Sequence, residues 1–172
     1  MKKQLLALAV LALAAGTASA QANDTLAKIK SSGTVNLGVR DSSGLAFTIG
    51  GGKYVGFHTE MAERIVDDLK KVTGNPNLKI NYQVITSQNR IPLLQNGTID
   101  FECGSTTNNA GRQKDAAFAV TTFVDEVRTA VKANSGIKSV ADLNGKTVVT
   151  TTGTTSVQHL RRHERGANID FK

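Results

Sequence analysis

Short strand-like segments alternate with helix-like segments along this chain, and that alternation limits its fold more than any other feature. Residues 34–40 (TVNLGVR) carry apolar side chains at every second position, which predicts a strand with one buried face. Residues 57–72 carry apolar side chains at three- and four-residue intervals, which predicts an amphipathic helix that stops before Gly74. Strands that alternate with helices predict an α/β fold built on a doubly wound, parallel sheet.

The same two patterns recur over the rest of the chain. Residues 41–56, which include three consecutive glycines, predict a loop. We expect further strands at 78–85, 99–103, 146–150 (this one buried) and from 168 onward, extended chain at 117–124 and 126–131, and helices at 24–30, 89–95, 140–143 and from 153 to about 165.

The N-terminus has the three parts of a secretory signal peptide. Two lysines precede an apolar run over residues 5–15, and small residues follow at 18–20. We expect residues 1–20 to be removed by cleavage after Ala20, or cleavage to follow Ala22, and the protein to be exported. The apolar run is too short for a membrane anchor, since about 20 residues are needed to cross a bilayer.

The charge balance bears on the choice of partner. The chain has 21 Lys and Arg against 14 Asp and Glu, a formal net charge of +7. Removing residues 1–20 takes away two lysines and no acidic residue, so 19 basic residues remain and the charge becomes +5. A modest positive charge suits an anionic small ligand, and nucleic acid is a poor partner for an exported protein. The single cysteine, Cys103, excludes a disulfide scaffold and a zinc cluster made of cysteines.

Polar side chains follow the predicted strands where they end, and parallel sheets bind their ligands at that edge. Arg40 ends the first strand, and Ser87 and Arg90 lie three residues apart at the start of a short helix. A guanidinium beside the free N–H groups of a helix start forms a site for a carboxylate. The alternatives are a surface arginine at position 40, and a helix cap by Thr86 or Ser87 beside a solvated Arg90.

Two further polar segments also follow strands. The loop at 104–109 (GSTTNN) offers hydroxyls, amides and backbone N–H groups that recognise polar ligands, although these residue types also favour hydrogen-bonded turns. The turn at 152–156 (TGTTS) lies between a predicted strand and a predicted helix, where an anion can bind. Residues 144–147 (NGKT) resemble the end of a P-loop, but Val140 stands where that motif needs glycine, which excludes a nucleotide site.

Residue types suited to catalysis or metal binding are few. His58 begins a predicted helix, and His159 and His163 lie four residues apart on a later one with Leu160 where a zinc protease has glutamate. The chain has no Gly-x-Ser-x-Gly nucleophile elbow, and Cys103 has no histidine near it in the sequence. We therefore expect no metal, no cofactor and no enzymatic activity.

Residues 86–109 (TSQNRIPLLQNGTIDFECGSTTNN) closely resemble the periplasmic glutamate/aspartate-binding proteins of ABC amino-acid transporters. Residues 38–43 (GVRDSS), 116–118 (AAF) and 151–156 (TTGTTS) resemble the same family in the same order. The resemblance implies the type II periplasmic binding protein fold, in which a ligand binds between two lobes that close by a hinge motion.

The resemblance also implies a division into domains. Residues 21–125 correspond to a first lobe that lacks only its C-terminal return segment, and residues 126–172 to the start of a second lobe. Because proteins of this family are considerably longer, we expect the chain to be truncated within the second lobe. The implied function is capture of glutamate or aspartate by a monomeric subunit that delivers it to permease subunits in the inner membrane.

Site residues carry over from the family motifs one by one. Arg90, supported by Ser87, is similar to the arginine that clamps a ligand carboxylate, and Arg40 to the arginine that selects an acidic side chain. The resemblance also implies that Ser105 and Thr107 match contacts to the amino-acid head group, and that Thr155 matches the position whose backbone N–H meets the α-carboxylate.

Three alternatives remain open at this point. A periplasmic enzyme of the same fold, similar to a dehydratase, would need an acid or base in the cleft, and Asp41 and Glu102 are the candidates at the strand ends. The sensory domain of a receptor and a non-functional truncated product are the other two.

Overall fold

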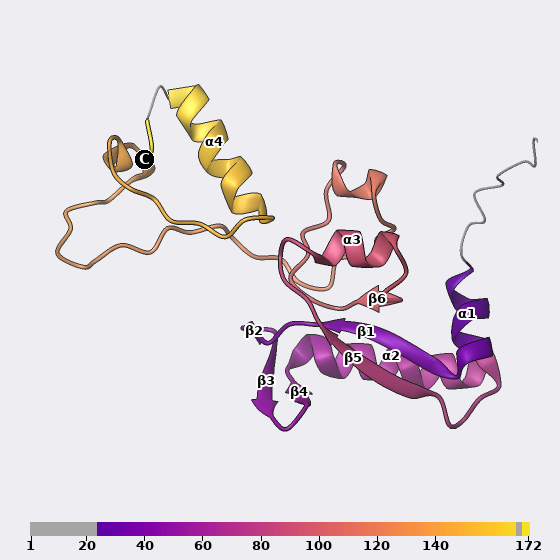
Figure 1. The fold of residues 1–172 in the computed structure, drawn as a ribbon. Coiled ribbons are helices and arrows are strands. Elements are labelled where there is room, and N and C mark those ends of the chain that lie inside the picture. The colour runs from indigo at the N-terminus through magenta and orange to yellow at the C-terminus, as the bar shows by residue number, and fades with distance from the viewer. Residues whose placement is uncertain (1–23, 168–169) are drawn as a thin grey trace, which may run out of the picture.

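The computed structural model describes residues 24–167 and 170–172 (Figure 1). The predicted signal peptide and both predicted cleavage sites lie outside the described residues. In chain order the elements are α1 (Thr25–Ser32), β1 (Thr34–Val39), β2 (Ser42–Ser43), β3 (Ala46–Gly50), β4 (Lys53–Val55), α2 (Phe57–Thr73), β5 (Lys79–Val84), α3 (Arg90–Gln95), β6 (Phe101–Glu102), the 3-10 helices η1 (Arg112–Lys114) and η2 (Val140–Leu143), and α4 (Thr155–Ala167). No helix of the described residues is long and apolar enough to cross a membrane.

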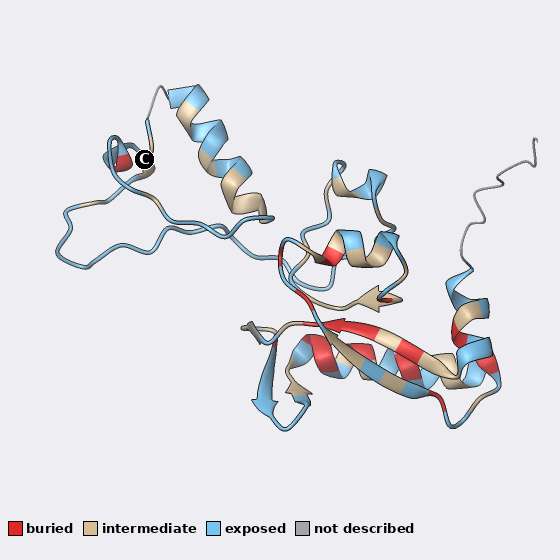
Figure 2. Ribbon diagram, viewed as in Figure 1, coloured by how far each residue is buried: buried red, intermediate tan, exposed pale blue. Residues whose placement is uncertain are grey.

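A parallel three-stranded sheet in the order β5-β1-β6 organises the first half of the chain. β1 pairs with β5 over its whole length, from Thr34 opposite Lys79 to Val39 opposite Val84, and with β6 at Leu37 and Gly38. Alternate side chains of β1 are buried against α1 and α2, and Figure 2 shows the buried residues along β1 and on the adjoining face of α2. The alternation read from the sequence therefore predicted the central strand correctly.

The core on one face of β1 divides into two clusters along the strand. Val35 packs with Ile29, Val66 and Leu78, while Leu37 packs with Val39 and Ala62. Gly38 lies between Leu37 and Val39 and faces the opposite side of the strand. It lets the Ile99 side chain approach the β1 backbone closely, because a Cβ at position 38 would lie 2.8 Å from Cδ1 of Ile99. Burial of these aliphatic side chains, at about 25 cal/mol per Å² of apolar surface, is the main stabilising contribution to the sheet.

Residues 41–56, predicted as a loop, contain a small antiparallel sheet in the order β2-β3-β4. Phe47 pairs with Val55, and Thr48 with Tyr54. The three consecutive glycines at 50–52 all have positive φ, which reverses the chain between β3 and β4 without steric cost. The prediction was wrong because these strands are short and mostly exposed, so their apolar alternation is weak.

Residues beyond the first sheet contain less regular structure. The segments predicted as extended at 117–124 and 126–131 contain no assigned strand or helix, and α4 confirms the helix predicted from residue 153. The buried strand predicted at 146–150 was wrong: Val149 is 91% exposed. Its backbone nevertheless pairs with the end of the chain, since Val148 N–H donates to Lys172 C=O at 2.9 Å and Lys172 N–H donates to Lys146 C=O at 3.0 Å. These hydrogen bonds pair residues 146–148 with the end of the chain. A pair of exposed segments of this kind is not a strand buried within a sheet. Residues 168–169, where a further strand was expected to begin, are not described.

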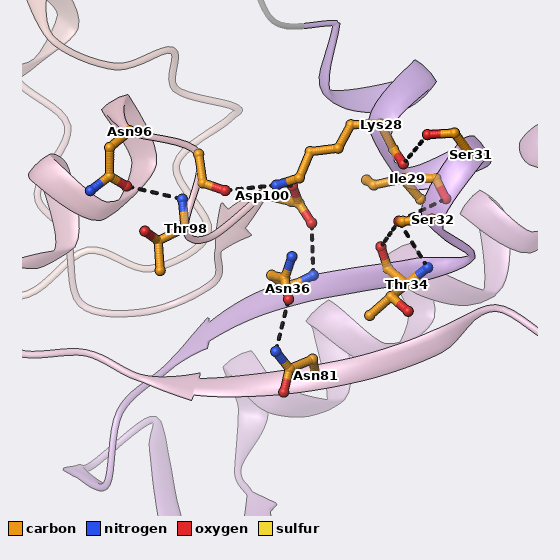
Figure 3. A network of polar contacts seen from close by, with 11 residues as sticks. Lys28, Ile29, Ser31, Ser32, Thr34, Asn36, Asn81, Asn96, Thr98 and Asp100 are labelled. Atoms are coloured by element: carbon orange, nitrogen blue, oxygen red, sulfur yellow. Dashed lines mark hydrogen bonds and ion pairs between the residues drawn. The ribbon is translucent and has the colours of Figure 1, made fainter.

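A polar network joins α1, β1 and the turn before β6 (Figure 3). The Lys28 ammonium lies 2.8 Å from Oδ1 of Asp100 and donates to the Gly97 carbonyl at 2.7 Å. The other oxygen of Asp100 accepts from the Asn36 backbone N–H at 2.7 Å. The Asp100 side chain is only 1% exposed, so both of its carboxylate oxygens have partners where water has little access.

We expect the change Asp100→Asn to lower the free energy of unfolding by about 1–3 kcal/mol, because it removes the charge from a buried, hydrogen-bonded pair. Urea unfolding of the mature protein followed by circular dichroism measures this. The matched control is Asp67→Asn, which removes an ion pair with Lys70 on the exposed surface of α2 and should change stability very little. Equal effects of the two changes would contradict the structural role of Asp100.

Candidate functional site

The carboxyl ends of β1, β5 and β6 meet at one edge of the sheet. Gly38 pairs with Gln83 on one side and with Glu102 on the other, so the residues that follow these positions come together. The pairing continues past the end of β1, since Ile85 N–H donates to Val39 C=O at 2.9 Å. This is the edge at which the sequence predicted Arg40 and the loop at 104–109, and Ser87 and Arg90 follow β5 at the same edge.

Arg40 and Ser87 are in direct contact at this edge. Nη1 of Arg40 donates to the Ser87 hydroxyl at 3.2 Å, and Nε of Arg40 is buried without a hydrogen-bond partner. The turn before α3 is held by other residues: Thr86 N–H donates to Oδ1 of Asn89 at 2.7 Å, and Asn89 N–H donates to the Thr86 hydroxyl at 3.2 Å. Thr86 therefore makes the local turn contact, and the Ser87 hydroxyl is directed to Arg40.

Arg90 begins α3 and is the most buried of the predicted site residues, at 2% exposure. Two of its guanidinium nitrogens, Nε and Nη1, are buried and have no hydrogen-bond partner in the described structure. Burial lowers the pKa of Arg90 from its ordinary value, and the positive charges of Arg112 and Arg40 lower it further, while Glu102 opposes this effect. A buried cation with unpartnered N–H groups is a strong site for an anion that can accept from them.

Glu102 is a member of the site that the sequence did not assign to binding. It ends β6, and its side chain is 4% exposed. Oε1 lies 3.9 Å from Nη1 of Arg90, and Oε2 accepts a hydrogen bond of 2.5 Å from the Thr106 hydroxyl. Sequence analysis indicated Glu102 only as a candidate acid or base, because the strand order that brings it beside Arg90 is a property of the tertiary fold.

Arg112 is the second member that sequence reasoning missed. Nη1 donates to the Thr107 carbonyl at 3.0 Å, and Nη2 donates to the Gly153 carbonyl at 2.9 Å. Its guanidinium thus connects the polar loop at 104–109 with the turn that precedes α4. In the sequence Arg112 is one basic residue, with Lys114, in a polar segment. Its position three residues after Asn109 is the local signal that could have linked it to the polar loop.

Gly153 brings the turn before α4 against the start of α3. It has φ of 80°, and a Cβ there would lie 2.5 Å from the Ser87 carbonyl oxygen and 2.8 Å from Cα of Gln88. Only glycine fits this position without movement of one backbone or the other. The turn at 152–156 is therefore adjacent to the segment that carries Ser87.

The remaining predicted residues lie on these segments with different environments. Ser105 and Thr107 are exposed on the loop after β6, and Thr155 is the first residue of α4, where backbone N–H groups are free. Within the described part of the chain, the side chains of Ser105, Thr107 and Thr155 make no hydrogen bond to Arg40 or Arg90. The structure thus joins Arg40 to Ser87 by a hydrogen bond, places Arg90 where the charge of Arg40 acts on it, and leaves the other three at the margin of the site.

The histidines and the cysteine lie outside this arginine cluster. His58 is 1% exposed, its Nε2 lies 3.1 Å from the Thr122 hydroxyl, and burial lowers its pKa. His159 and His163 are exposed on α4. Burial, together with the charge of Glu102, raises the pKa of the free Cys103 thiol, which favours its protonated form. Among the described residues no group of His, Cys, Asp and Glu could hold a metal ion.

Comparison with known proteins gives consistent results. The L-glutamate/L-aspartate-binding protein of Pseudomonas aeruginosa is 45% identical over 162 residues, which cover 91% of this chain and 53% of that protein. The glutamate/aspartate import solute-binding protein of Escherichia coli K12 is 46% identical over 162 residues, which cover 91% of this chain and 54% of that protein. The chain therefore spans about half the length of the curated relatives it matches.

A solved structure and a family profile agree with these relatives. The structure of an ancestral arginine-binding protein bound to arginine matches with a TM-score of 0.63 and 29% identity, over 81% of this chain and 60% of that one. The profile of the bacterial extracellular solute-binding proteins, family 3, matches residues 35–165. The predicted type II periplasmic binding protein fold is thereby confirmed, and the chain belongs to the bacterial extracellular solute-binding proteins of family 3.

Proposed function

We propose that this protein is the periplasmic solute-binding subunit of an ABC importer and that it captures glutamate or aspartate. The observation that carries the proposal is the convergence of Arg40 and Arg90 at the carboxyl edge of the sheet, with buried guanidinium nitrogens that have no partner. The names of the relatives from P. aeruginosa and E. coli support an acidic amino acid as ligand.

The two arginines have separate roles in this proposal. Arg90, with Ser87 beside it, clamps a ligand carboxylate, and Arg40 selects the acidic side chain. A neutral side chain such as that of glutamine would leave one buried guanidinium without an anion, which is costly.

The residues at the margin bind the other end of the ligand. Ser105 and Thr107 contact the amino-acid head group, and the Thr155 backbone N–H at the start of α4 donates to the α-carboxylate, where the helix dipole is favourable. Arg112 adds a further cation and holds the Thr107 and Gly153 carbonyls in place.

The two-lobe division completes the proposal. Residues 21–125 form the first lobe and residues 126–172 the start of the second, and the ligand lies where the Gly153 turn meets the first lobe. A micromolar ligand needs about 8 kcal/mol of net binding free energy, and each charge-assisted hydrogen bond contributes about 1.5–3 kcal/mol. Contacts from both lobes are therefore required once the association cost of at least about 4 kcal/mol is included.

Binding is favoured over an enzymatic function on this fold. The relatives compared above are named as binding proteins, and Glu102, a candidate acid or base, lies beside Arg90 and accepts from Thr106. We propose further that the protein acts as a monomer in the periplasm after removal of its signal peptide, and that it docks on permease subunits of the inner membrane.

We expect the change Arg90→Ala in the full-length protein to abolish measurable glutamate binding, because the ligand carboxylate loses its buried, charged donor. Isothermal titration calorimetry measures the affinity, and thermal unfolding confirms that the variant is folded. The control is Arg64→Ala, which removes an exposed arginine from α2 and should leave the affinity unchanged. Retained affinity in the Arg90 variant would refute the clamp assignment.

A second change addresses the choice between acidic and neutral ligands. We expect Arg40→Met to weaken glutamate binding by roughly 10- to 100-fold, the equivalent of about one charge-assisted hydrogen bond, and to affect glutamine binding much less. Competition calorimetry with both amino acids gives the ratio of the two affinities. A parallel loss for both ligands would show that Arg40 does not select the side chain.

A further inference from the structure

Glu102 places a buried carboxylate among the three arginines of the site, and the proposed binding scheme gives it no role. It lies at the end of β6, opposite Gly38 of the central strand. Its side chain is 4% exposed, and that of Arg90 is 2% exposed. Burial lowers the pKa of Arg90, the charge of Glu102 raises it, and the charges of Arg112 and Arg40 lower it. Of the charges that act on Arg90 here, Glu102 is therefore the anion, and Arg40 and Arg112 are the cations.

The two oxygens of this carboxylate have different environments. Oε2 accepts from the Thr106 hydroxyl at 2.5 Å. Oε1 is buried without a hydrogen-bond partner, and it lies 3.9 Å from Nη1 of Arg90, which is beyond hydrogen-bonding distance. The Thr106 contact thus holds the carboxylate next to Arg90 without a direct hydrogen bond between them.

The loop after β6 is built closely around this carboxylate. A Cβ at position 104 would lie 2.7 Å from Oε1 of Glu102, so Gly104 lets the backbone pass directly over it. The carboxylate is therefore confined by Gly104 on one side and by Thr106 on another. Its position relative to Arg90 is fixed by the loop and does not depend on a flexible surface side chain.

We propose that Glu102 is an internal counter-ion that stabilises the unliganded arginine site and competes with the ligand carboxylate for Arg90. The inference rests on the proposed function, because the ligand is taken to be an acidic amino acid. An incoming carboxylate accepts from the unpartnered Nε and Nη1 of Arg90, and a fixed anion beside that guanidinium weakens the attraction. Glu102 thereby lowers the affinity for an acidic ligand and makes its release easier.

The test is the change Glu102→Gln in the full-length protein, with Glu60→Gln on the exposed surface of α2 as the matched control. Glutamine keeps the size of the side chain and an oxygen that accepts from Thr106, and it removes the charge. We expect glutamate affinity to rise by roughly 10-fold, glutamine affinity to change much less, and the unliganded protein to melt at a lower temperature. A gain in affinity together with a loss of stability does not arise from simple damage to the fold.

The outcomes separate this inference from the proposed function. A wild-type protein that binds neither glutamate nor aspartate would overturn the proposed function. In that case the melting temperature of the unliganded protein tests the counter-ion role. A Glu102→Gln variant that melts at the same temperature as the wild-type protein would overturn it. If the wild-type protein binds glutamate, then an affinity of the variant that is equal or lower, or an unchanged ratio of glutamate to glutamine affinity, overturns the inference.

A second pair of variants tests the restraint by Thr106. The change Thr106→Val removes the hydrogen bond to Oε2 and lets the carboxylate approach Arg90, so we expect glutamate affinity to fall more than glutamine affinity. Thr106→Ser keeps the hydroxyl and should restore the wild-type ratio. Equal behaviour of the two Thr106 variants would show that the hydrogen bond does not restrain Glu102.

Cys103 provides a check that the charge has been removed. Glu102 contributes to the raised pKa of the neighbouring thiol, so loss of its charge should increase the thiolate fraction. We expect Cys103 to react faster with iodoacetamide at pH 8 in the Glu102→Gln variant than in the wild-type protein or in the Glu60→Gln control. An unchanged rate would contradict a charge of Glu102 that acts on its surroundings at this edge, and with it the counter-ion role.

Discussion

The parallel pairing of β1 with β5 and β6 is the constraint on which the site depends. Because all three strands run in the same direction, the residues after their carboxyl ends arrive at one edge from positions far apart in the sequence. Arg40 and Ser87 are 47 residues apart and make a hydrogen bond there. A shift of one residue in the register of β1 would move every side chain of this strand to the other face and would separate these groups.

Buried charged groups have hydrogen-bond partners at one end of this sheet and lack them at the other. At the amino end, both oxygens of Asp100 have partners, and the carboxylate connects α1 to the sheet. At the carboxyl end, Arg40, Arg90 and Glu102 are left with buried atoms that have no partner in the described structure. Native proteins rarely leave such groups unsatisfied, and a bound molecule is one physical explanation for a cluster of them. This contrast within one sheet is the physical reason to look for ligand binding at the arginine edge.

Local sequence patterns predicted the elements whose burial is regular. β1 and α2 were predicted to within a residue or two, since each has one face packed into the core and therefore a clear period of apolar residues. The antiparallel strands at 42–55 were missed because their exposure removes that period, and residues 146–150 were wrongly expected to be buried. Arg40, Ser87 and Arg90 were predicted as site residues from strand ends and family motifs, whereas Glu102 and Arg112 come next to them through tertiary contacts that no local spacing encodes.

The contact between Gly153 and Ser87 shows how the part of the chain that carries α4 is coupled to the arginine edge. A Cβ at position 153 would overlap the Ser87 backbone, so this approach is available to glycine alone. Arg112 spans the same boundary, because it donates to carbonyls of Thr107 and Gly153. A ligand that draws Arg112 or the Ser87 region toward itself would therefore also act on the turn before α4. In a hinged binding protein, that coupling links occupancy of the anion site to the relative position of the two lobes.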